Sequence, residues 1–208
     1  MKTIARNDDR STLTNLTIPE GVREIGFGEY ACYSALTIVI LPSSVERIGD
    51  MAFWSCESLA HVMIPEGAES IGACAFSDCA SLEKIVVPHS VKTIGKSAFQ
   101  YCLFLTSVVI PEGVLRIGES AFEGCSLLTS VAIPSSVESI GACAFYRCAS
   151  LRKVVVSAEA PTVGVRAFDL CPALSEAFAP ASVGVVGEGA FDPRVVVRRN
   201  PREESANR

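Results

Sequence analysis

The sequence predicts a solenoid of eight stacked coils, each of 23 residues, with a parallel β-sheet along one face and short 3₁₀ or helical turns along the other. An Ile-Gly dipeptide, softened to Val-Gly in the last two coils, returns every 23 residues from Ile25 to Val186 without an insertion. A leucine opens every coil, and an aromatic residue stands four positions after each glycine. A unit this short cannot bury an apolar face alone, so the units must stack on one another. The opening leucines are Leu13, Leu36, Leu59, Leu82, Leu105, Leu128, Leu151 and Leu174.

The segment that follows each leucine favours a strand, because it alternates in hydrophobicity and is rich in β-branched residues. A proline ends this segment in seven coils, with Ser157 as the exception, and a residue without an N–H cannot continue a sheet ladder. We expect parallel strands, each paired to the same segment of the neighbouring coils. They should lie near residues 13–19, 36–42, 59–65, 82–88, 105–111, 128–134, 151–157 and 174–180.

The return segment begins at the glycine, which either takes a positive φ or lets neighbouring backbones approach closely. The rest of the segment is too short for an ordinary helix, so we expect a 3₁₀ or single-turn helical piece. Its aromatic residues should stack into an internal spine. These residues are Tyr30, Phe53, Phe76, Phe99, Phe122, Phe145, Phe168 and Phe191. Trp54, the only tryptophan, either anchors a partner or covers this side of the coil.

Six of the nine cysteines occupy one repeated slot, three residues after the aromatic residue. They are Cys56, Cys79, Cys102, Cys125, Cys148 and Cys171. Cysteines one strand spacing apart are close enough for disulfides. Because the repeat and not any pairing sets the slot, we expect small buried apolar side chains and reduced thiols. The pair Cys74 and Cys79 lacks the four converging ligands that a zinc site needs, so no metal site is predicted.

The repeat L-x-x-V-x-I-P-x-x-V-x-x-I-G-x-x-A-F-x-x-C resembles the BspA-like, or Treponema-type, leucine-rich repeat over residues 13–191. The resemblance implies a right-handed leucine-rich-repeat solenoid of the α/β type. It also implies a binding role, because family members include bacterial surface proteins that bind host matrix components.

Three parts follow from the repeat boundaries: a polar arm at 1–12, the solenoid at 13–191, and a tail at 192–208 with a possible terminal strand around Val195–Val197. Either the arm and the tail cap the exposed end coils, or the chain is part of something larger. The first ten residues lack the apolar stretch of a signal peptide, so we expect a cytoplasmic protein, or a cell-surface one if the chain is a fragment.

Composition and chemistry argue for binding and against catalysis. A net charge of −5 argues against a nucleic-acid partner, and no apolar run is long enough to span a bilayer. The two histidines, His61 and His89, lie in different parts of adjacent coils, with no serine or cysteine in phase to form a nucleophile–base pair. We therefore predict no catalytic residue, no cofactor and a protein partner.

One row of outward-facing strand residues stands out as a candidate binding surface. By strand alternation the residue between the repeat's valine and isoleucine points to solvent, and this row is apolar in seven coils out of eight. After Thr17 it reads Ile40, Met63, Val86, Val109, Ala132, Val155 and Phe178, which we call the apolar stripe and predict as the partner-binding residues. Val86, Val109 and Val155 should be solvent-exposed. The neighbouring outward row is mostly polar: Asn15, Ile38, His61, Lys84, Ser107, Ser130, Lys153 and Glu176.

Overall fold

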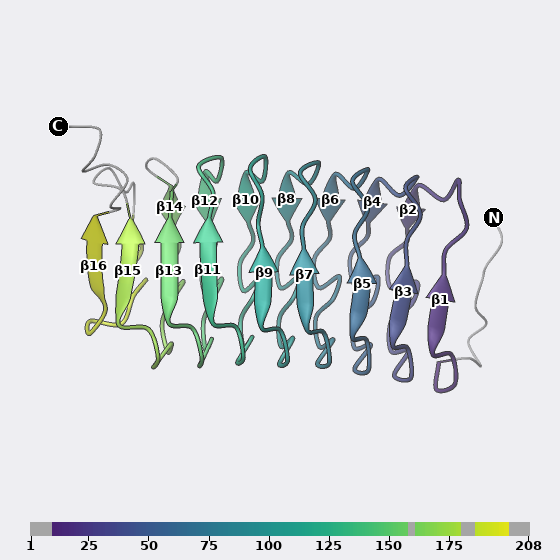
Figure 1. Cartoon of the computed structure of the whole chain (residues 1–208), viewed down its shortest axis with the longest axis horizontal. Coiled ribbons are helices and arrows are strands. Elements are labelled where there is room, and N and C mark those ends of the chain that lie inside the picture. Colours follow the sequence, from purple (N-terminus) through teal and green to yellow (C-terminus); the bar gives the residue numbers. More distant parts are fainter. Residues whose placement is uncertain (1–9, 158–160, 180–185, 200–208) are drawn as a thin grey trace.

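Every coil contributes one longer strand to one face of the molecule, and each of the first seven coils contributes a two-residue strand to the other face (Figure 1). The structure is a computed structural model that describes residues 10–157, 161–179 and 186–199. The longer strands are β1 (Asn15–Thr17), β3 (Ile38–Ile40), β5 (His61–Met63), β7 (Lys84–Val86), β9 (Ser107–Val109), β11 (Ser130–Ile133), β13 (Lys153–Val156) and β15 (Glu176–Ala179). The short strands are β2 (Glu24–Ile25), β4 (Arg47–Ile48), β6 (Ser70–Ile71), β8 (Thr93–Ile94), β10 (Arg116–Ile117), β12 (Ser139–Ile140) and β14 (Thr162–Val163).

The predicted parallel stacking is confirmed, with each longer strand inside its predicted segment and paired with residues 23 positions away, as Asn15 is with Ile38. The strands are only three or four residues long, shorter than predicted, and residue 180 of the last segment lies outside the described residues. Their ladder is also not continuous. Its hydrogen-bonded groups are β1-β3-β5, β7-β9 and β11-β13-β15 joined by β16 (Val196–Arg199).

The second, seven-stranded sheet was not predicted, because two residues per coil are too few to show a strand pattern in sequence. Each of its strands ends on the isoleucine or valine that precedes the repeat glycine, and that side chain is buried. The core therefore lies between two parallel sheets.

The expected 3₁₀ or helical return segment is wrong, since no described residue is helical. In coil after coil two residues of this segment have a positive φ, as Met51 and Ser55 do at +56°. Every second N–H reaches the next coil: Met51 N bonds to Ala73 O at 2.7 Å and Phe53 N to Ala75 O at 2.8 Å. The left-handed residues interrupt helical geometry and turn these N–H groups toward the neighbouring coil.

The repeat glycine is required because the backbones of neighbouring coils approach closely at this position, and not because its φ is positive. None of the described Ile-Gly or Val-Gly glycines has a left-handed backbone. A Cβ at Gly95 would lie 2.5 Å from the carbonyl carbon of Gly72 and 2.7 Å from the backbone nitrogen of Ala73. Any side chain at this position would push the coils apart.

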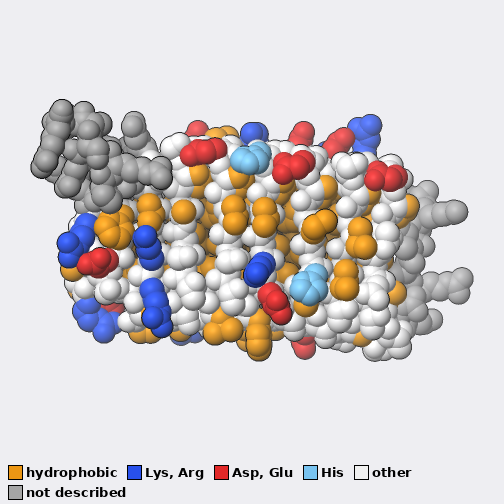
Figure 2. Space-filling view, viewed as in Figure 1, with side chains coloured by type: hydrophobic (Ala, Val, Ile, Leu, Met, Phe, Trp, Pro, Cys, Tyr) orange, Lys and Arg blue, Asp and Glu red, His pale blue; other side chains and the backbone are white. Residues whose placement is uncertain are grey.

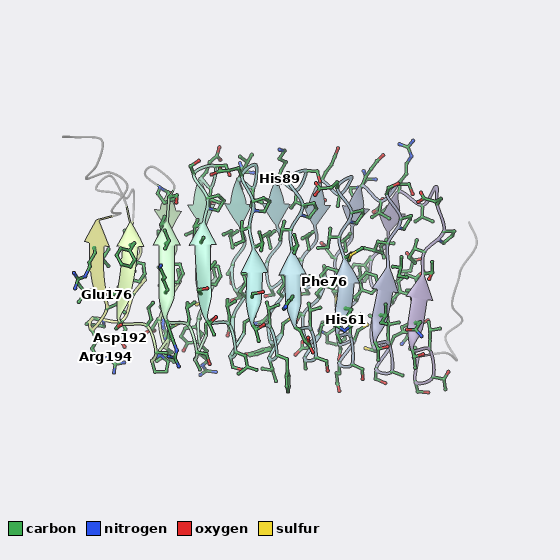
Figure 3. All side chains as sticks on the ribbon, in the orientation of Figure 1. His61, Phe76, His89, Glu176, Asp192 and Arg194 are labelled. Carbon is green, nitrogen blue, oxygen red and sulfur yellow. The ribbon has the colours of Figure 1, made fainter. Side chains whose placement is uncertain are left out.

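The predicted aromatic spine is confirmed. Neighbouring rings from Tyr30 to Phe191 stack with centroids 4.9 to 5.5 Å apart and planes within 11° of parallel. Phe76, labelled in Figure 3, stacks between Phe53 and Phe99 at 5.3 Å on either side. The six phenylalanines from Phe53 to Phe168 are fully buried.

A strand also forms in the predicted tail. β16 pairs with β15 at an offset of 20 residues, so that Glu176 faces Val196, and thereby covers the free edge of β15. Arg198 forms an ion pair with Glu176 at 2.9 Å, and Arg194 forms one with Asp192 at 2.8 Å (Figure 3). Residues 1–9 of the arm and 200–208 of the tail lie outside the described residues.

Candidate partner-binding face

The strand register places the residues of the apolar stripe side by side on the surface. Ile40 pairs with Met63, and Val86 pairs with Val109. All four side chains are more than half exposed, and Met63 reaches 79%. Figure 2 shows hydrophobic side chains along this face. The middle residue of each three-residue strand, such as Val108 in β9, points into the core instead.

The stripe changes character toward its C-terminal end. Ala132 is exposed, but Val155 and Phe178 are half-buried, so the expectation that Val155 would be exposed is wrong. Val155 faces Phe178 across β13 and β15, and the ammonium of Lys153 lies 5.9 Å from the centroid of the Phe178 ring. The large Phe178 ring lies beside Val155 at this end of the face.

An acidic row lies along the edge of the stripe, at the turns that follow the prolines. Glu20, Glu66 and Glu112 are exposed there, and we call these three residues the acidic edge. Figure 2 shows carboxylates along this border of the hydrophobic face. The polar row on the other side of the stripe carries His61, Lys84 and Lys153, and a single carboxylate, that of Glu176.

The acidic edge recurs in every second coil, because over the first six coils the turns alternate between Pro-Glu-Gly and a form with serine in place of glycine. The serine of one coil bonds to the glycine turn of the coil before it. Ser136 Oγ accepts from Gly113 N at 2.9 Å and donates to Val114 O at 2.8 Å, and Ser44 does the same with Gly21 and Val22. The glycine turn also approaches its preceding coil, since a Cβ at Gly113 would lie 2.8 Å from His89 O.

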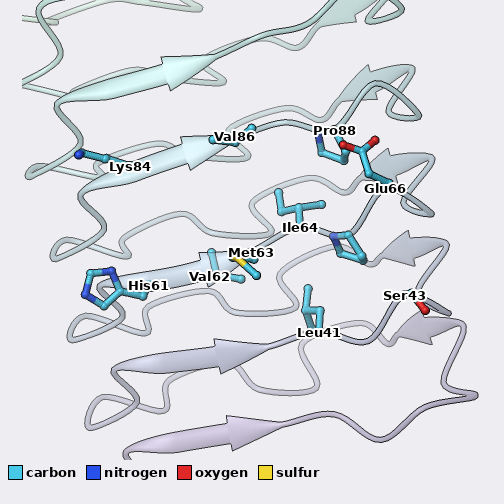
Figure 4. A pocket seen from close by; sticks show the side chains of 11 residues that line it. Leu41, Ser43, His61, Val62, Met63, Ile64, Glu66, Lys84, Val86 and Pro88 are labelled. Atoms are coloured by element: carbon cyan, nitrogen blue, oxygen red, sulfur yellow. The ribbon is translucent and has the colours of Figure 1, made fainter.

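A groove of about 680 Å³ opens in this face where β5 and β7 are not hydrogen-bonded to one another (Figure 4). Its walls include Met63, Ile64 and Val86, while Glu66 and Lys84 bring opposite charges to its lining. A second hollow of about 220 Å³, lined by Ile40 and Met63 among others, continues it toward β3. No sequence pattern predicts this groove, because the break in the hydrogen-bonded ladder has no sequence signature.

Both histidines lie on the surface, in different parts of adjacent coils as predicted. His61 is exposed on β5 and lines the groove, and His89 is exposed on the turn after Pro88 with Nδ1 3.4 Å from Glu112 O. Figure 3 shows that the two histidines lie at well-separated positions of their two adjacent coils. Trp54 is half-buried, and its Nε1 donates to Asp78 Oδ2 in the next coil at 3.2 Å.

The six repeat-slot cysteines are buried, and all nine cysteines are free. Their role goes beyond filling space, because each thiol donates a hydrogen bond to a backbone carbonyl of the preceding coil, as Cys56 Sγ does to Tyr30 O at 3.1 Å and Cys79 Sγ to Phe53 O at 3.2 Å. The other four thiols bond in the same way at 3.2 Å. Burial raises the pKa of Cys56 to about 12, so this thiol stays protonated.

A second exposed apolar patch was missed. It comprises Tyr101, Leu103, Phe104 and Leu127, at the turns that lead into β9 and β11, and Phe104 is its most exposed member at 58%. The signal lies in the two residues before the opening leucine. Coil four carries Leu103 and Phe104 there, where most other coils carry small or polar residues.

The described part of the chain offers little for chemistry. It contains no group of three or more histidine, cysteine, aspartate or glutamate side chains placed to hold a metal ion. It also contains no helix of the length and hydrophobicity needed to cross a bilayer.

Three solved structures resemble this fold. A leucine-rich repeat protein of T. pallidum matches at 29% identity and a TM-score of 0.69, over 82% of this chain and 81% of that one. A leucine-rich cell surface protein from Faecalibacterium prausnitzii matches at 26% identity and a TM-score of 0.58, over 90% and 69%. The pneumococcal vaccine antigen PcpA shares the fold at 15% identity and a TM-score of 0.55, over 93% and 64%.

The family comparison rests on sequence. A search of curated proteins found no match. The model of the BspA-type leucine-rich repeat region matches residues 8–105 and 92–195, which together span the whole solenoid at 13–191. The chain therefore belongs to the BspA-type leucine-rich repeat family.

Proposed function

We propose that this chain is a non-catalytic interaction module that binds a partner protein through the apolar stripe and the adjacent turns. The observation that carries the proposal is the contrast between two outward rows on the same strands. β-propensity applies equally to both, yet one row is apolar and exposed from Ile40 to Val109 while the other is mostly polar. A continuous apolar patch of this kind marks contact sites on soluble proteins.

The test introduces a charge into the stripe and a matched charge beside it. Val109→Glu and Ser107→Glu both change exposed positions on β9, on the same face. Both should shift the free energy of unfolding by no more than about 0.5 kcal/mol, as exposed substitutions do. Val109→Glu should nevertheless lose the partner, because a buried unpaired charge in an interface is costly.

The measurement is affinity capture from the native source, with the wild type and both variants side by side. The wild type and Ser107→Glu should retain the same protein, and Val109→Glu should lose it. If the wild type and both variants retain the protein equally, the apolar stripe does not bind it and serves only to stabilise the strands. A lower melting temperature for Val109→Glu alone would mean that its side chain contributes to the core.

The second candidate function is a surface adhesin or ligand receptor. It is favoured by the 26% identical protein from Faecalibacterium prausnitzii, which is described as a cell surface protein. Protease treatment of intact cells of the native source separates the two. Digestion of the chain supports the surface role, and full protection supports a location inside the cell.

A further inference from the structure

The spacing along the apolar stripe restricts the secondary structure that can lie on it. The stripe presents one side chain per coil, and parallel strands repeat about every 4.8 Å. An α-helix presents one apolar side chain per turn, about every 5.4 Å, whereas same-face residues of an extended chain repeat about every 6.6 Å. Over the three intervals from Ile40 to Val109 the mismatch is about 2 Å for a helix and about 5 Å for a strand. A helix lying along the solenoid therefore matches the stripe better.

The acidic edge carries the second constraint. Along the series Glu20, Glu66 and Glu112, each glutamate lies two coils from the next, a distance of about 9.6 Å. Residues seven positions apart on a helix are about 10.5 Å apart on one side of it. Glu20 and Glu66 make no hydrogen bond or ion pair with any described residue. Their carboxylates are thus available to cations of a partner at that interval.

The charge of Glu112 is held in place by the next coil. Its carboxylate accepts hydrogen bonds from Ser135 N at 3.0 Å, from Ser135 Oγ at 2.9 Å and from Ser136 N at 3.0 Å. These bonds, led by the one from Ser135 N, lower the pKa of Glu112, so that it stays ionised at neutral pH. The acidic edge is therefore negative beside an apolar surface.

The groove between β5 and β7 forms a hollow in the middle of the surface made by the apolar stripe and the acidic edge. Met63 and Val86 lie beside it, Glu66 lies at the acidic edge, and Figure 4 shows their side chains around the same hollow. A volume of about 680 Å³ accommodates large apolar side chains that project from a docked element.

We propose that the partner segment is a basic amphipathic α-helix that lies along the solenoid axis. Its apolar seam packs on Ile40, Met63, Val86 and Val109, and its lysines or arginines at seven-residue intervals face Glu20, Glu66 and Glu112. This inference rests on the proposed function and adds the chemistry of the partner. A second copy of this chain does not offer such an element, because none of its described residues is helical.

The experiment uses synthetic peptides and the full chain. One fluorescent peptide of about five turns carries leucines at i, i+3, i+4 and i+7 and lysines along one flank, held helical by a side-chain staple. The second peptide has glutamates in place of the lysines, and the third has the first one's composition in a scrambled order. Fluorescence anisotropy measures the Kd of each for the wild type, for Glu66→Lys and for Glu57→Lys. Glu57 is an exposed glutamate on the turn that leads into β5 and serves as the matched control.

The lysine peptide should bind the wild type at least tenfold more tightly than either other peptide, and added salt should weaken this binding. Glu66→Lys should raise its Kd about tenfold, and Glu57→Lys should leave it unchanged. If Glu66→Lys lowers the melting temperature, Glu20→Lys replaces it in the same comparison.

Three outcomes would overturn the inference: equal binding of the scrambled peptide, equal or tighter binding of the glutamate peptide, or an equal loss for Glu57→Lys. A wild-type dimer in sedimentation that Val109→Glu dissociates would also overturn it, because the face would then be filled by a second copy. A native partner that depends on Val109, together with no peptide binding, would leave the proposed function intact and refute only the basic helix.

Discussion

The thiol of Cys102 donates a hydrogen bond to the carbonyl oxygen of Phe76, with the sulfur 3.2 Å from the oxygen. The bond joins two neighbouring coils, and it lies beside the stacked ring of the same phenylalanine. Five further cysteines repeat this relationship. The cysteine slot therefore combines a small buried side chain with a second donor to a carbonyl that also accepts from a backbone N–H of its own coil, as Phe76 O does from Cys79 N at 3.2 Å.

The first prediction concerns the accessibility of these thiols. Cys56, Cys79, Cys102, Cys125, Cys148 and Cys171 should resist a thiol reagent in the native protein, because their side chains are buried. Only Cys32, Cys74 and Cys143, which are partly exposed, should react quickly. After unfolding, all nine should titrate as free thiols. Rapid native labelling of the six, or a shortfall after unfolding, would contradict this reading.

The second prediction concerns alkaline pH. Burial raises the pKa of Cys56 to about 12, whereas an unfolded thiol has a pKa of about 8.5. The folded state thus holds the proton more tightly, so its contribution to stability is complete below about pH 8.5 and is lost as pH rises toward 12. The free energy of unfolding should fall by up to about 1.4 kcal/mol per pH unit for each such thiol. Urea titrations across this range, with Cys56→Ala as the comparison, should show a smaller pH slope for the variant.

The third prediction concerns the aromatic spine. Phe99 is fully buried between Phe76 and Phe122, so Phe99→Ala should lower the free energy of unfolding by about 3–5 kcal/mol. Phe191 stacks on one ring only and is partly buried, so Phe191→Ala should cost less. Chemical denaturation of both variants checks the order, and equal costs would argue against a continuous spine.

The fourth prediction separates two kinds of glycine. Gly95→Ala should destabilise the protein by about 3 kcal/mol, because its Cβ meets the backbone of the preceding coil at 2.5 Å. Gly28→Ala should cost only about 1 kcal/mol, since its φ is +56° but no atom lies within 4 Å of the added Cβ. Met51 and Ser97 occupy the equivalent position in other coils with the same left-handed backbone. A smaller loss for Gly95→Ala than for Gly28→Ala would refute the close approach of the coils.

The sequence was sufficient to predict every feature that depends on the same type of side chain at the same position of each coil. The 23-residue period placed the longer strands, the spine and the buried cysteines, because each depends on a fixed apolar slot. It failed where backbone geometry decides. Met51, Asp78 and Arg147 have left-handed conformations that their residue types do not announce, so the return segment looked helical in sequence.

For the apolar stripe, the sequence predicted which side chains point outward more accurately than it predicted how exposed each of them is. Alternation showed that Val86 and Val109 point outward, as they do. It did not show that Val155 would be half-buried beside Phe178, because that depends on the size of a neighbouring side chain and not on alternation. The groove beside Met63 depends on a local loss of hydrogen bonds between coils and was not predictable from any single residue.

The alternation of Gly113 and Ser136 has a consequence for how such a chain can change in length. Duplication of a single 23-residue unit would set two glycine turns or two serine turns next to each other, and one of those two would lack the hydrogen bond that Gly113 N makes to Ser136 Oγ. Duplication of two adjacent units would preserve every such contact and add one glutamate to the border. In this region the genetic unit of growth, and the sensible module for engineering a longer scaffold, is therefore a pair of coils of 46 residues.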